Sequence, residues 1–132
     1  MDTRQLVHAF YGELWNKWDD VALETVLAVG FTFRGSLGNQ THGRTEWREY
    51  RDLIRAGSSD FHNQVQTLVI DGTQAAVRLI YSGTHDGPLA GMAPTGRRFA
   101  YAGAAFFTAD DGQLTSGWVL GDLASLREQL DA

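Results

Sequence analysis

Apolar residues near the start of the chain recur at helical spacing. Leu6, Phe10 and Leu14 stand four residues apart, with Val7 and Tyr11 beside them, and together they form one apolar stripe on a helix. We expect this helix to begin with Thr3 as its N-cap and to end at residue 15 or 16.

Two further helices are predicted before residue 57. Asp19 or Asp20 can cap a short second helix, because a carboxylate accepts from the free N–H groups of a first turn, and Gly30 is expected to end it. Residues 31–35 read as a short strand and residues 36–40 as a loop. The third helix is expected over residues 45–56, with these inward positions: Trp47, Tyr50, Leu53 and Ile54.

The remaining sequence predicts β structure. Strands are expected over residues 62–70, 73–84, 97–108 and 113–121, because apolar and polar residues alternate there. The Asp-Gly pairs at 71–72 and 111–112 are hairpin turn signals, and residues 85–96 form a Gly- and Pro-rich connection. A short C-terminal helix carries Leu126 and Leu130.

This order, three helices followed by a meander of long antiparallel strands, predicts an α+β domain over residues 1–132. Glycines within long strands allow a sheet to bend strongly. A curved sheet with helices across its mouth encloses a concave interior, so we expect a small pocket.

Composition excludes several classes of protein. The chain contains no cysteine, so disulfides, thiolate metal sites and a thiol nucleophile are excluded. No apolar run approaches the length of a transmembrane helix, and no signal peptide opens the chain. These absences favour the cytoplasm.

The charge pattern disfavours a nucleic-acid partner. The formal net charge is −5, and four arginines that share one side of the third helix (Arg44, Arg48, Arg51 and Arg55) are interleaved with acidic residues. We interpret this side as a solvated helix face. None of the four histidines has the short spacing of a metal motif, and no P-loop, dinucleotide fingerprint or serine nucleophile elbow is present. We therefore expect no metal and no cofactor.

The second half of the chain carries a recognisable series of motifs. Residues 81–98 read YSGTHDGPLAGMAPTGRR, residues 118–122 read WVLGD, and residues 129–130 read QL. This series resembles the SnoaL-like polyketide (ester) cyclases of the NTF2-like fold. The LWNK at residues 14–17 and the GR at residues 43–44 resemble the first half of that family's pattern more loosely.

The resemblance implies a cone-shaped α+β fold with three N-terminal helices, and commonly a homodimer. It also implies an aldol-type ring closure, without metal or cofactor, in which an aspartate is the acid/base. That aspartate corresponds to Asp122. The stretch of residues 104–107 reads AAFF where the anthracycline cyclases carry polar pocket residues, so a largely apolar substrate is expected.

The residues themselves offer two interpretations of Asp122. A two-residue period from residue 113 places Trp118, Leu120 and Asp122 on one largely apolar face, where lost hydration raises the pKa of a carboxyl and suits it to exchange protons near neutrality. Alternatively, Asp122 caps the helix that follows it, and capping lowers the pKa.

Five other side chains are candidate pocket residues, and one of them is Leu120, which shares the apolar face of Trp118 and Asp122. His85 can donate to a substrate oxygen, or it can be a loop histidine bonded to its neighbours. Trp118 can stack on a flat substrate or be a core residue. Tyr101 can be a second proton donor or a core tyrosine. His62 can lie at the mouth of the pocket or have a structural role.

Two functions remain open at this point. The first is a small cyclase or related isomerase or lyase, with Asp122 as acid/base. The second is a non-catalytic protein that binds a small apolar ligand or acts through its sheet face in a dimer.

Overall fold

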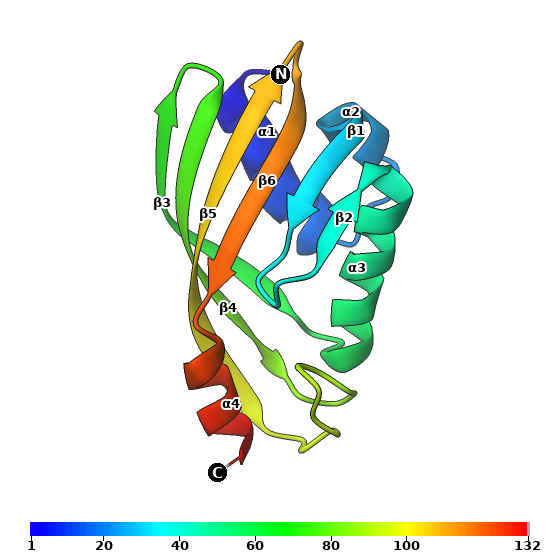
Figure 1. The fold of residues 1–132 in the computed structure, drawn as a ribbon, viewed down its shortest axis with the longest axis vertical. Helices are drawn as coiled ribbons and strands as arrows, with labels where there is room; N and C mark the ends of the chain where they lie inside the picture. Colours follow the sequence, from blue (N-terminus) through cyan, green and yellow to red (C-terminus); the bar gives the residue numbers. More distant parts are fainter. Residues whose placement is uncertain (132) are drawn as a thin grey trace.

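Residues 1–131 are described by a computed structural model, in which helices cover one face of a curved sheet (Figure 1). The helical elements are α1 (Thr3–Ala9), η1 (Phe10–Trp15, a π-helix), α2 (Leu23–Val26), α3 (Gly43–Gly57) and α4 (Leu123–Asp131). Ala132, the last residue of the expected domain, lies outside the described residues. None of these helices is long and apolar enough to span a membrane.

The sheet has six strands in the order β2-β1-β6-β5-β4-β3. Their bounds are β1 Leu27–Arg34, β2 Gln40–His42, β3 His62–Asp71, β4 Gln74–Thr84, β5 Arg98–Asp110 and β6 Gln113–Gly121. The meander from β3 to β6 is antiparallel, as the sequence predicts. The expected α+β class and the curved sheet are confirmed.

The sheet differs from the prediction at its β2 edge. Residues 40–42 form β2, which pairs with β1, although residues 36–40 are predicted as loop. β1 runs parallel to β6, so the sheet is not wholly antiparallel. Gly30 does not end a helix, because β1 begins at Leu27 and passes through it.

The first helix begins one residue earlier than predicted and widens midway. Asp2, not Thr3, is the N-cap: its carboxylate accepts from the Gln5 N–H at 2.8 Å, and the Asp2 N–H donates back to the Gln5 side chain at 3.0 Å. This reciprocal pair is a capping box. Further along, the Asn16 N–H bonds to the Tyr11 carbonyl, five residues back, and such π turns are frequent at functional sites.

Neither predicted cap of the second helix caps it. α2 has no side-chain cap; the Asp19 carboxylate accepts from the Val21 N–H at 2.8 Å, and Asp20 pairs with Arg51 at 2.6 Å. Arg51 is 2% exposed, so the arginines of α3 are not one solvated face. A buried guanidinium needs partners, and Arg51 finds Asp20, Asp52 and the Leu14 carbonyl.

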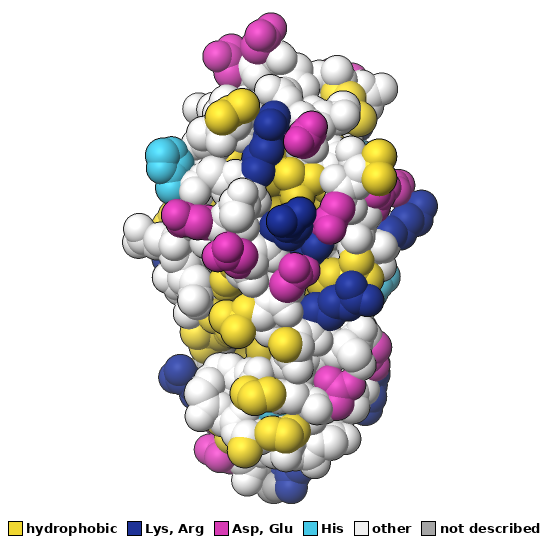
Figure 2. All heavy atoms as spheres, turned by 90° about the vertical axis from the view of Figure 1, so that its right-hand side faces the viewer, with side chains coloured by type: hydrophobic (Ala, Val, Ile, Leu, Met, Phe, Trp, Pro, Cys, Tyr) yellow, Lys and Arg dark blue, Asp and Glu magenta, His cyan; other side chains and the backbone are white. Residues whose placement is uncertain are grey.

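The core lies between the inner face of the sheet and the layer of α1, η1 and α3. Phe10 is its centre, with four aromatic neighbours besides Tyr11: Phe31, Phe33, Trp47 and Phe107. Leu53, predicted to face inward, is exposed instead. Figure 2 shows the α3 side of the molecule, where charged side chains of both signs cover the upper part and hydrophobic ones gather below.

Candidate functional site

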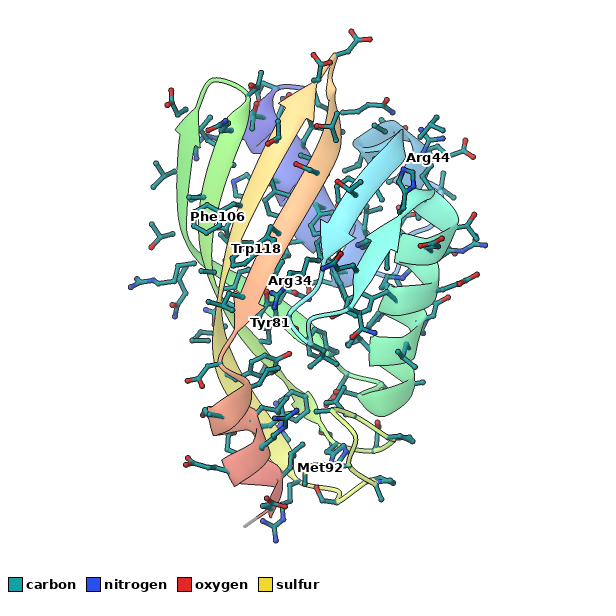
Figure 3. The ribbon with its side chains drawn as sticks, viewed as in Figure 1. Arg34, Arg44, Tyr81, Met92, Phe106 and Trp118 are labelled. Carbon is teal, nitrogen blue, oxygen red and sulfur yellow. The ribbon has the colours of Figure 1, made fainter. Side chains whose placement is uncertain are left out.

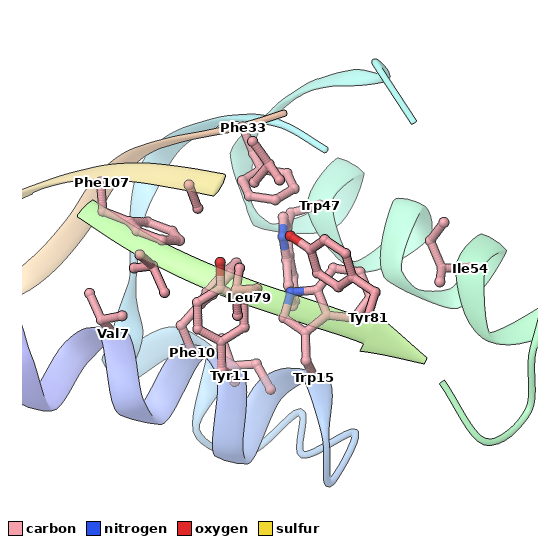
Figure 4. Packing of buried hydrophobic residues seen from close by; sticks show 14 of the residues in the cluster. Val7, Phe10, Tyr11, Trp15, Phe33, Trp47, Ile54, Leu79, Tyr81 and Phe107 are labelled. Carbon is pink, nitrogen blue, oxygen red and sulfur yellow. The ribbon is translucent and has the colours of Figure 1, made fainter. Parts of the chain in front are cut away.

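All four tyrosines of the chain converge in the interior. Tyr11 comes from η1, Tyr50 from α3, Tyr81 from β4 and Tyr101 from β5, and each is buried. The Tyr81 and Tyr101 rings lie 5.0 Å apart. Figure 4 shows Tyr11 and Tyr81 within the same aromatic core as Trp15 and Trp47.

The space that these side chains leave is small. An interior cavity of about 10 Å³ is lined by Tyr11, Trp15, Phe33, Ser36, Tyr50, Ile54, Phe61, Asn63, Tyr81 and Val119. The cone of this fold is therefore filled largely by its own aromatic rings.

Burial raises the pKa of every tyrosine in this cluster. Desolvation is the largest cause for all four, and the neighbouring Tyr11 hydroxyl raises the pKa of Tyr81 further. A phenol with a raised pKa stays protonated at neutral pH. The cluster thus presents neutral O–H donors to the interior.

Two of these hydroxyls have partners within the protein. Tyr101 and Ser36 share a hydrogen bond of 3.0 Å between their hydroxyl oxygens. The Leu37 N–H donates to the Tyr50 oxygen at 3.4 Å. Both contacts join the tyrosines to the turn that connects β1 and β2.

The Tyr11 hydroxyl is buried, and it makes no hydrogen bond of normal geometry among residues 1–131. The Tyr81 hydroxyl lies near enough to lower the pKa of Tyr11 against the effect of desolvation, but it does not complete such a bond. The buried Trp47 Nε1–H makes no hydrogen bond there either. An unmade hydrogen bond in the interior costs free energy, and each such group in a native structure asks for an explanation. For Tyr11, which lines the cavity, a ligand oxygen would supply the missing acceptor.

Two glycines make room for the tyrosine rings. A Cβ atom at Gly103 would overlap the Tyr81 ring, and one at Gly35 would overlap the Tyr50 ring and hydroxyl. The absence of a side chain therefore lets β5 and the residue that follows β1 lie directly against these two rings.

A reciprocal amide pair anchors the end of the π-helix to the sheet. The Asn16 side chain donates to the Asn63 carbonyl and accepts from the Asn63 N–H, both at 2.8 Å. Asn16 belongs to the LWNK motif of the sequence, and its contacts hold the η1 segment, with Tyr11, over β3.

A larger, apolar vestibule lies beside the interior cavity. It measures about 470 Å³ and is lined by Leu37, Asn39, Leu53, Ile54, Pro88, Leu89, Ala90, Gly91 and Arg127. Ile54 lines both spaces, so it separates the vestibule from the tyrosines. The hydrophobic area low on the molecule in Figure 2 lies over this region.

Neither space is lined by an aspartate, a glutamate or a histidine from the described part of the chain. Arg127 is the charged residue of the vestibule lining. Residues 1–131 also hold no group of three or more potential metal-ligating His, Cys, Asp or Glu side chains.

Asp122 lies outside both spaces. Its carboxyl is exposed and accepts from the Ser125 N–H at 3.1 Å, as the N-cap of α4, which is the geometry of the capping interpretation. The expected apolar surroundings of this carboxyl are therefore wrong. Its role as acid/base stays a prediction that depends on the resemblance.

A β-bulge explains the error. Thr108 on β5 pairs with Ser116 while Ala109 pairs with Leu114, so Thr115 is an extra residue in β6. A slip of one residue moves every later side chain to the opposite face. Leu114 is buried, but Trp118 and Leu120 beyond the bulge are exposed on the outer face and line neither interior space.

The remaining predicted residues are separated from one another. His85 is fully buried in the 85–97 connection, where Nδ1 accepts from the Thr95 N–H at 3.2 Å and Nε2 lies 3.3 Å from the Met92 carbonyl. This matches the loop-histidine interpretation. His62 is exposed at the start of β3, and only Tyr101 lies in the tyrosine cluster.

Sequence reasoning missed Tyr11, Tyr50, Tyr81 and Ser36. A signal was present for Tyr11, which stands beside the apolar stripe of the first helix, and for Tyr50, which is predicted to face inward. What periodicity does not show is that tyrosines from different elements meet at one point.

The comparisons with known proteins agree with this fold. The family described as SnoaL-like polyketide cyclase matches residues 5–130. A protein from Jannaschia sp. CCS1 that is assigned to the SnoaL-like polyketide cyclases superposes with a TM-score of 0.88 at 20% identity, over 98% of this chain and 92% of that one.

Two Streptomyces structures are also similar. TsrD from Streptomyces laurentii has 26% identity and a TM-score of 0.85, over 96% of this chain and 92% of its own. IdmH from Streptomyces antibioticus, assigned as a polyketide cyclase, has 24% identity and a TM-score of 0.85 over the whole of both chains. No curated protein matches this chain in sequence. With the match over residues 5–130, the chain belongs to the SnoaL-like polyketide cyclase family.

Proposed function

We propose that this protein is a cofactor-independent cyclase, or a related isomerase or lyase, that acts on a small, largely apolar polyketide-like substrate. The observation that carries the proposal is the buried Tyr11 hydroxyl, which lines the interior cavity without a hydrogen bond of normal geometry in residues 1–131. Family membership supplies the reaction class. A homodimeric state and a cytoplasmic location are part of the same proposal.

The walls of the two spaces favour an apolar substrate. Five of the residues that line the vestibule are Leu, Ile or Pro, and a concave apolar site with few polar groups is typical for small ligands. The polar groups are the tyrosine hydroxyls deeper inside. A carbonyl oxygen at the leading end of the substrate can therefore bond to Tyr11.

A neutral tyrosine stabilises the charge that develops in ring closure. An aldol-type closure removes a proton α to one carbonyl, and negative charge then gathers on that carbonyl oxygen. An O–H donor fixed in a water-poor cavity strengthens its hydrogen bond as this charge grows. One such donor is typically worth about 10²–10³ in rate.

Two groups are candidate acceptors of the α proton in this mechanism. No acidic or histidine side chain of residues 1–131 lines either space, and Asp122 is engaged with the Ser125 N–H. If Asp122 acts as the acid/base, it must leave this cap. Otherwise, a basic group of the substrate itself takes up the α proton and then delivers it to the alkoxide that ring closure forms.

Substrate entry requires movement, because the interior space of about 10 Å³ is far smaller than a polyketide unit. Ile54 lines both the vestibule and the interior cavity, so a change of its rotamer would connect the two spaces. We expect Ile54→Ala to enlarge the passage and to raise affinity for bulky ligands.

The test is turnover of polyketide-like 1,3-dicarbonyl substrates, followed by mass spectrometry for isomeric or dehydrated ring products. Tyr11→Phe should lower the rate about 10²-fold or more. Tyr101→Phe is the matched control, because its hydroxyl already bonds to Ser36, and its effect should be smaller. Equal rates for Tyr11→Phe and wild type would reject the role of Tyr11.

Asp122→Asn separates the two versions of the mechanism. Asparagine can still cap α4 through its side-chain oxygen, so folding is preserved. A loss of turnover with substrate affinity intact supports Asp122 as acid/base. Unchanged turnover removes Asp122 from the mechanism and leaves the tyrosine cluster in place.

A second candidate function is non-catalytic binding of a small ligand. It is favoured by the absence of acidic and histidine side chains from the lining of both spaces within residues 1–131. It predicts that apolar ligands bind with the same affinity to wild type and Asp122→Asn, and that no polyketide-like substrate is converted.

The homodimer part of the proposal rests on the outer sheet face. Val69, Phe106 and Leu120 are more than half exposed there, and exposed apolar areas on a sheet often mark protein interfaces. Sedimentation velocity decides between a dimer and the 14.6 kDa monomer. A monomer at all concentrations would remove the dimer from the proposal.

A further inference from the structure

The outer face of the sheet carries a second depression, of about 490 Å³, between β6 and the β1–β2 pair. The strand register builds it: Arg34 on β1 lies opposite Trp118 on β6 and opposite Gln40 on β2. In the next row, Thr32 lies opposite Ser116 and His42. Phe33 is the residue that lines both this groove and the interior cavity.

Arg34 gives the groove a positive charge. Its Cζ atom lies over the Trp118 ring, 5.0 Å from the ring centre, in a cation–π contact, and its Nη1–H donates to the Val119 carbonyl. No carboxylate of residues 1–131 lies within ion-pair distance of it. Because the side chain is partly buried, the charge has lost water without gaining a counter-ion.

The remaining N–H groups of Arg34 are free to bind an anion. Only Nη1 donates to an acceptor in the described chain, so Nε and Nη2 are available. Two donors on one planar guanidinium match the two oxygens of a carboxylate. Since Nη1 is tied to the Val119 carbonyl, the orientation of the group is already set.

Trp118 supplies a flat apolar wall next to this cation. Its side chain is 44% exposed, and its ring centre lies 6.1 Å from that of Phe106 on β5. Figure 3 shows Arg34, Trp118 and Phe106 on neighbouring strands. Aromatic faces of this kind pack against other flat rings in an offset arrangement.

Polar side chains line the other end of the groove. Among its lining residues Glu46 is the carboxylate, and its oxygen accepts from the His42 N–H at 2.9 Å. A second negative charge on a ligand would be repelled by Glu46. The hydroxyls of Thr32 and Ser116 lie between the two ends and offer hydrogen bonds to a ring substituent.

We propose that this groove is a second ligand site, separate from the tyrosine cavity, and that it takes a planar aromatic monocarboxylate. The carboxylate binds to Nε and Nη2 of Arg34, and the ring packs beside the guanidinium against the exposed part of the Trp118 indole. A groove of this volume is within the range of small-molecule sites. Such a site is independent of the reaction proposed for the interior.

Calorimetric titration with 2-naphthoate tests the site. Wild type should bind one equivalent, whereas 2-naphthylmethanol, which lacks the charge, and cyclohexanecarboxylate, which is not planar, should bind at least about tenfold more weakly. Arg34→Gln should weaken binding of 2-naphthoate by about tenfold or more, and Trp118→Leu by several-fold.

Two controls locate the effect. Arg78→Gln removes an exposed cation of the outer face that does not line the groove, and Arg127→Gln removes the cation of the vestibule. Both should bind 2-naphthoate as wild type does. Arg34→Lys keeps the charge but loses the planar pair of donors, so an intermediate affinity with unchanged circular dichroism separates recognition from folding.

Several results would overturn the proposal. These are equal affinity in wild type and Arg34→Gln, loss of affinity in Arg127→Gln instead, or no saturable binding to wild type. The homodimer proposed above rests on Val69, Phe106 and Leu120, which do not line the groove, so binding should persist in a dimer. Binding that disappears when the dimer forms would also overturn the proposal, because a second copy would then occupy the groove.

Discussion

Aromatic residues occur on both faces of the sheet, but their surroundings differ. The inner face collects aromatic rings and four neutral hydroxyls, packed so closely that about 10 Å³ remains. The outer face exposes Phe106 and Trp118 beside a cation and leaves a groove of about 490 Å³. An aromatic residue therefore gives no information about its role until its face is known.

Neighbouring phenylalanines on β5 provide the sharpest contrast. Phe107 is 2% exposed and packs against Phe10, whereas Phe106 is 54% exposed. We expect Phe107→Ala to lower the free energy of unfolding by about 3–5 kcal/mol, because it leaves a cavity in the core. Phe106→Ala should change it by about 0.5 kcal/mol. Urea unfolding measures both, and similar losses for the two variants would contradict the assignment of faces.

The close approach of β5 to Tyr81 should give the next largest effect on the free energy of unfolding. Gly103→Ala places a Cβ atom into the Tyr81 ring and should cost about 1–3 kcal/mol through overpacking. Gly12→Ala is the matched control, since no atom lies within 4 Å of its added Cβ. Thermal unfolding of both variants measures this difference in stability. A neutral Gly103→Ala would mean that the tyrosine cluster can shift without cost.

Loss of the helix cap at the end of β6 should change stability less. Asp122→Ala removes the acceptor for the Ser125 N–H and should destabilise the protein by about 1 kcal/mol, a typical value for a lost N-cap. Asp122→Asn should retain most of that stability. Equal losses in both variants would show that the negative charge, and not the cap, stabilises α4.

The pH dependence of stability separates the buried tyrosines from exposed groups. In the folded protein the pKa of all four tyrosines is raised, chiefly by desolvation, whereas in the unfolded chain they ionise near the usual value of about 10. The folded state therefore holds these protons more tightly. Its stability is fully present below pH 10 and is lost as the pH rises above that value.

Absorbance at 295 nm during an alkaline titration measures this directly. Tyrosinate should appear only together with unfolding, in one cooperative step. A gradual rise near pH 10 with the fold intact, seen by circular dichroism, would show that at least one hydroxyl is exposed to water.

Low pH weakens a different contact, so its effect on stability has the opposite dependence on pH. Desolvation is the largest single effect on the Asp60 carboxyl and raises its pKa. The bonds that the carboxylate accepts from the Thr84 N–H and hydroxyl, at 2.7 and 2.8 Å, and from the Ser58 hydroxyl together outweigh desolvation and lower the pKa. The contribution of this carboxylate to stability is therefore present above about pH 4 and is lost as the pH falls below that value.

The sequence by itself determined the type and order of most elements. A four-residue spacing in the first helix and alternation in the four later strands follow directly from which side chains are removed from water. The motif series of residues 81–98 and 118–122 indicated the family that the match over residues 5–130 shows. These signals are local, so they can be read along the chain.

Tertiary structure decided the rest, because it depends on pairing between distant segments. The extra residue Thr115 in β6 turned Trp118 and Leu120 outward, and a bulge is defined only by the partner strand. β1 pairs in parallel with a strand more than 80 residues away. The meeting of Tyr11, Tyr50, Tyr81 and Tyr101 from four elements likewise exists only in the folded chain, where the surrounding core excludes the water that each hydroxyl would otherwise bind.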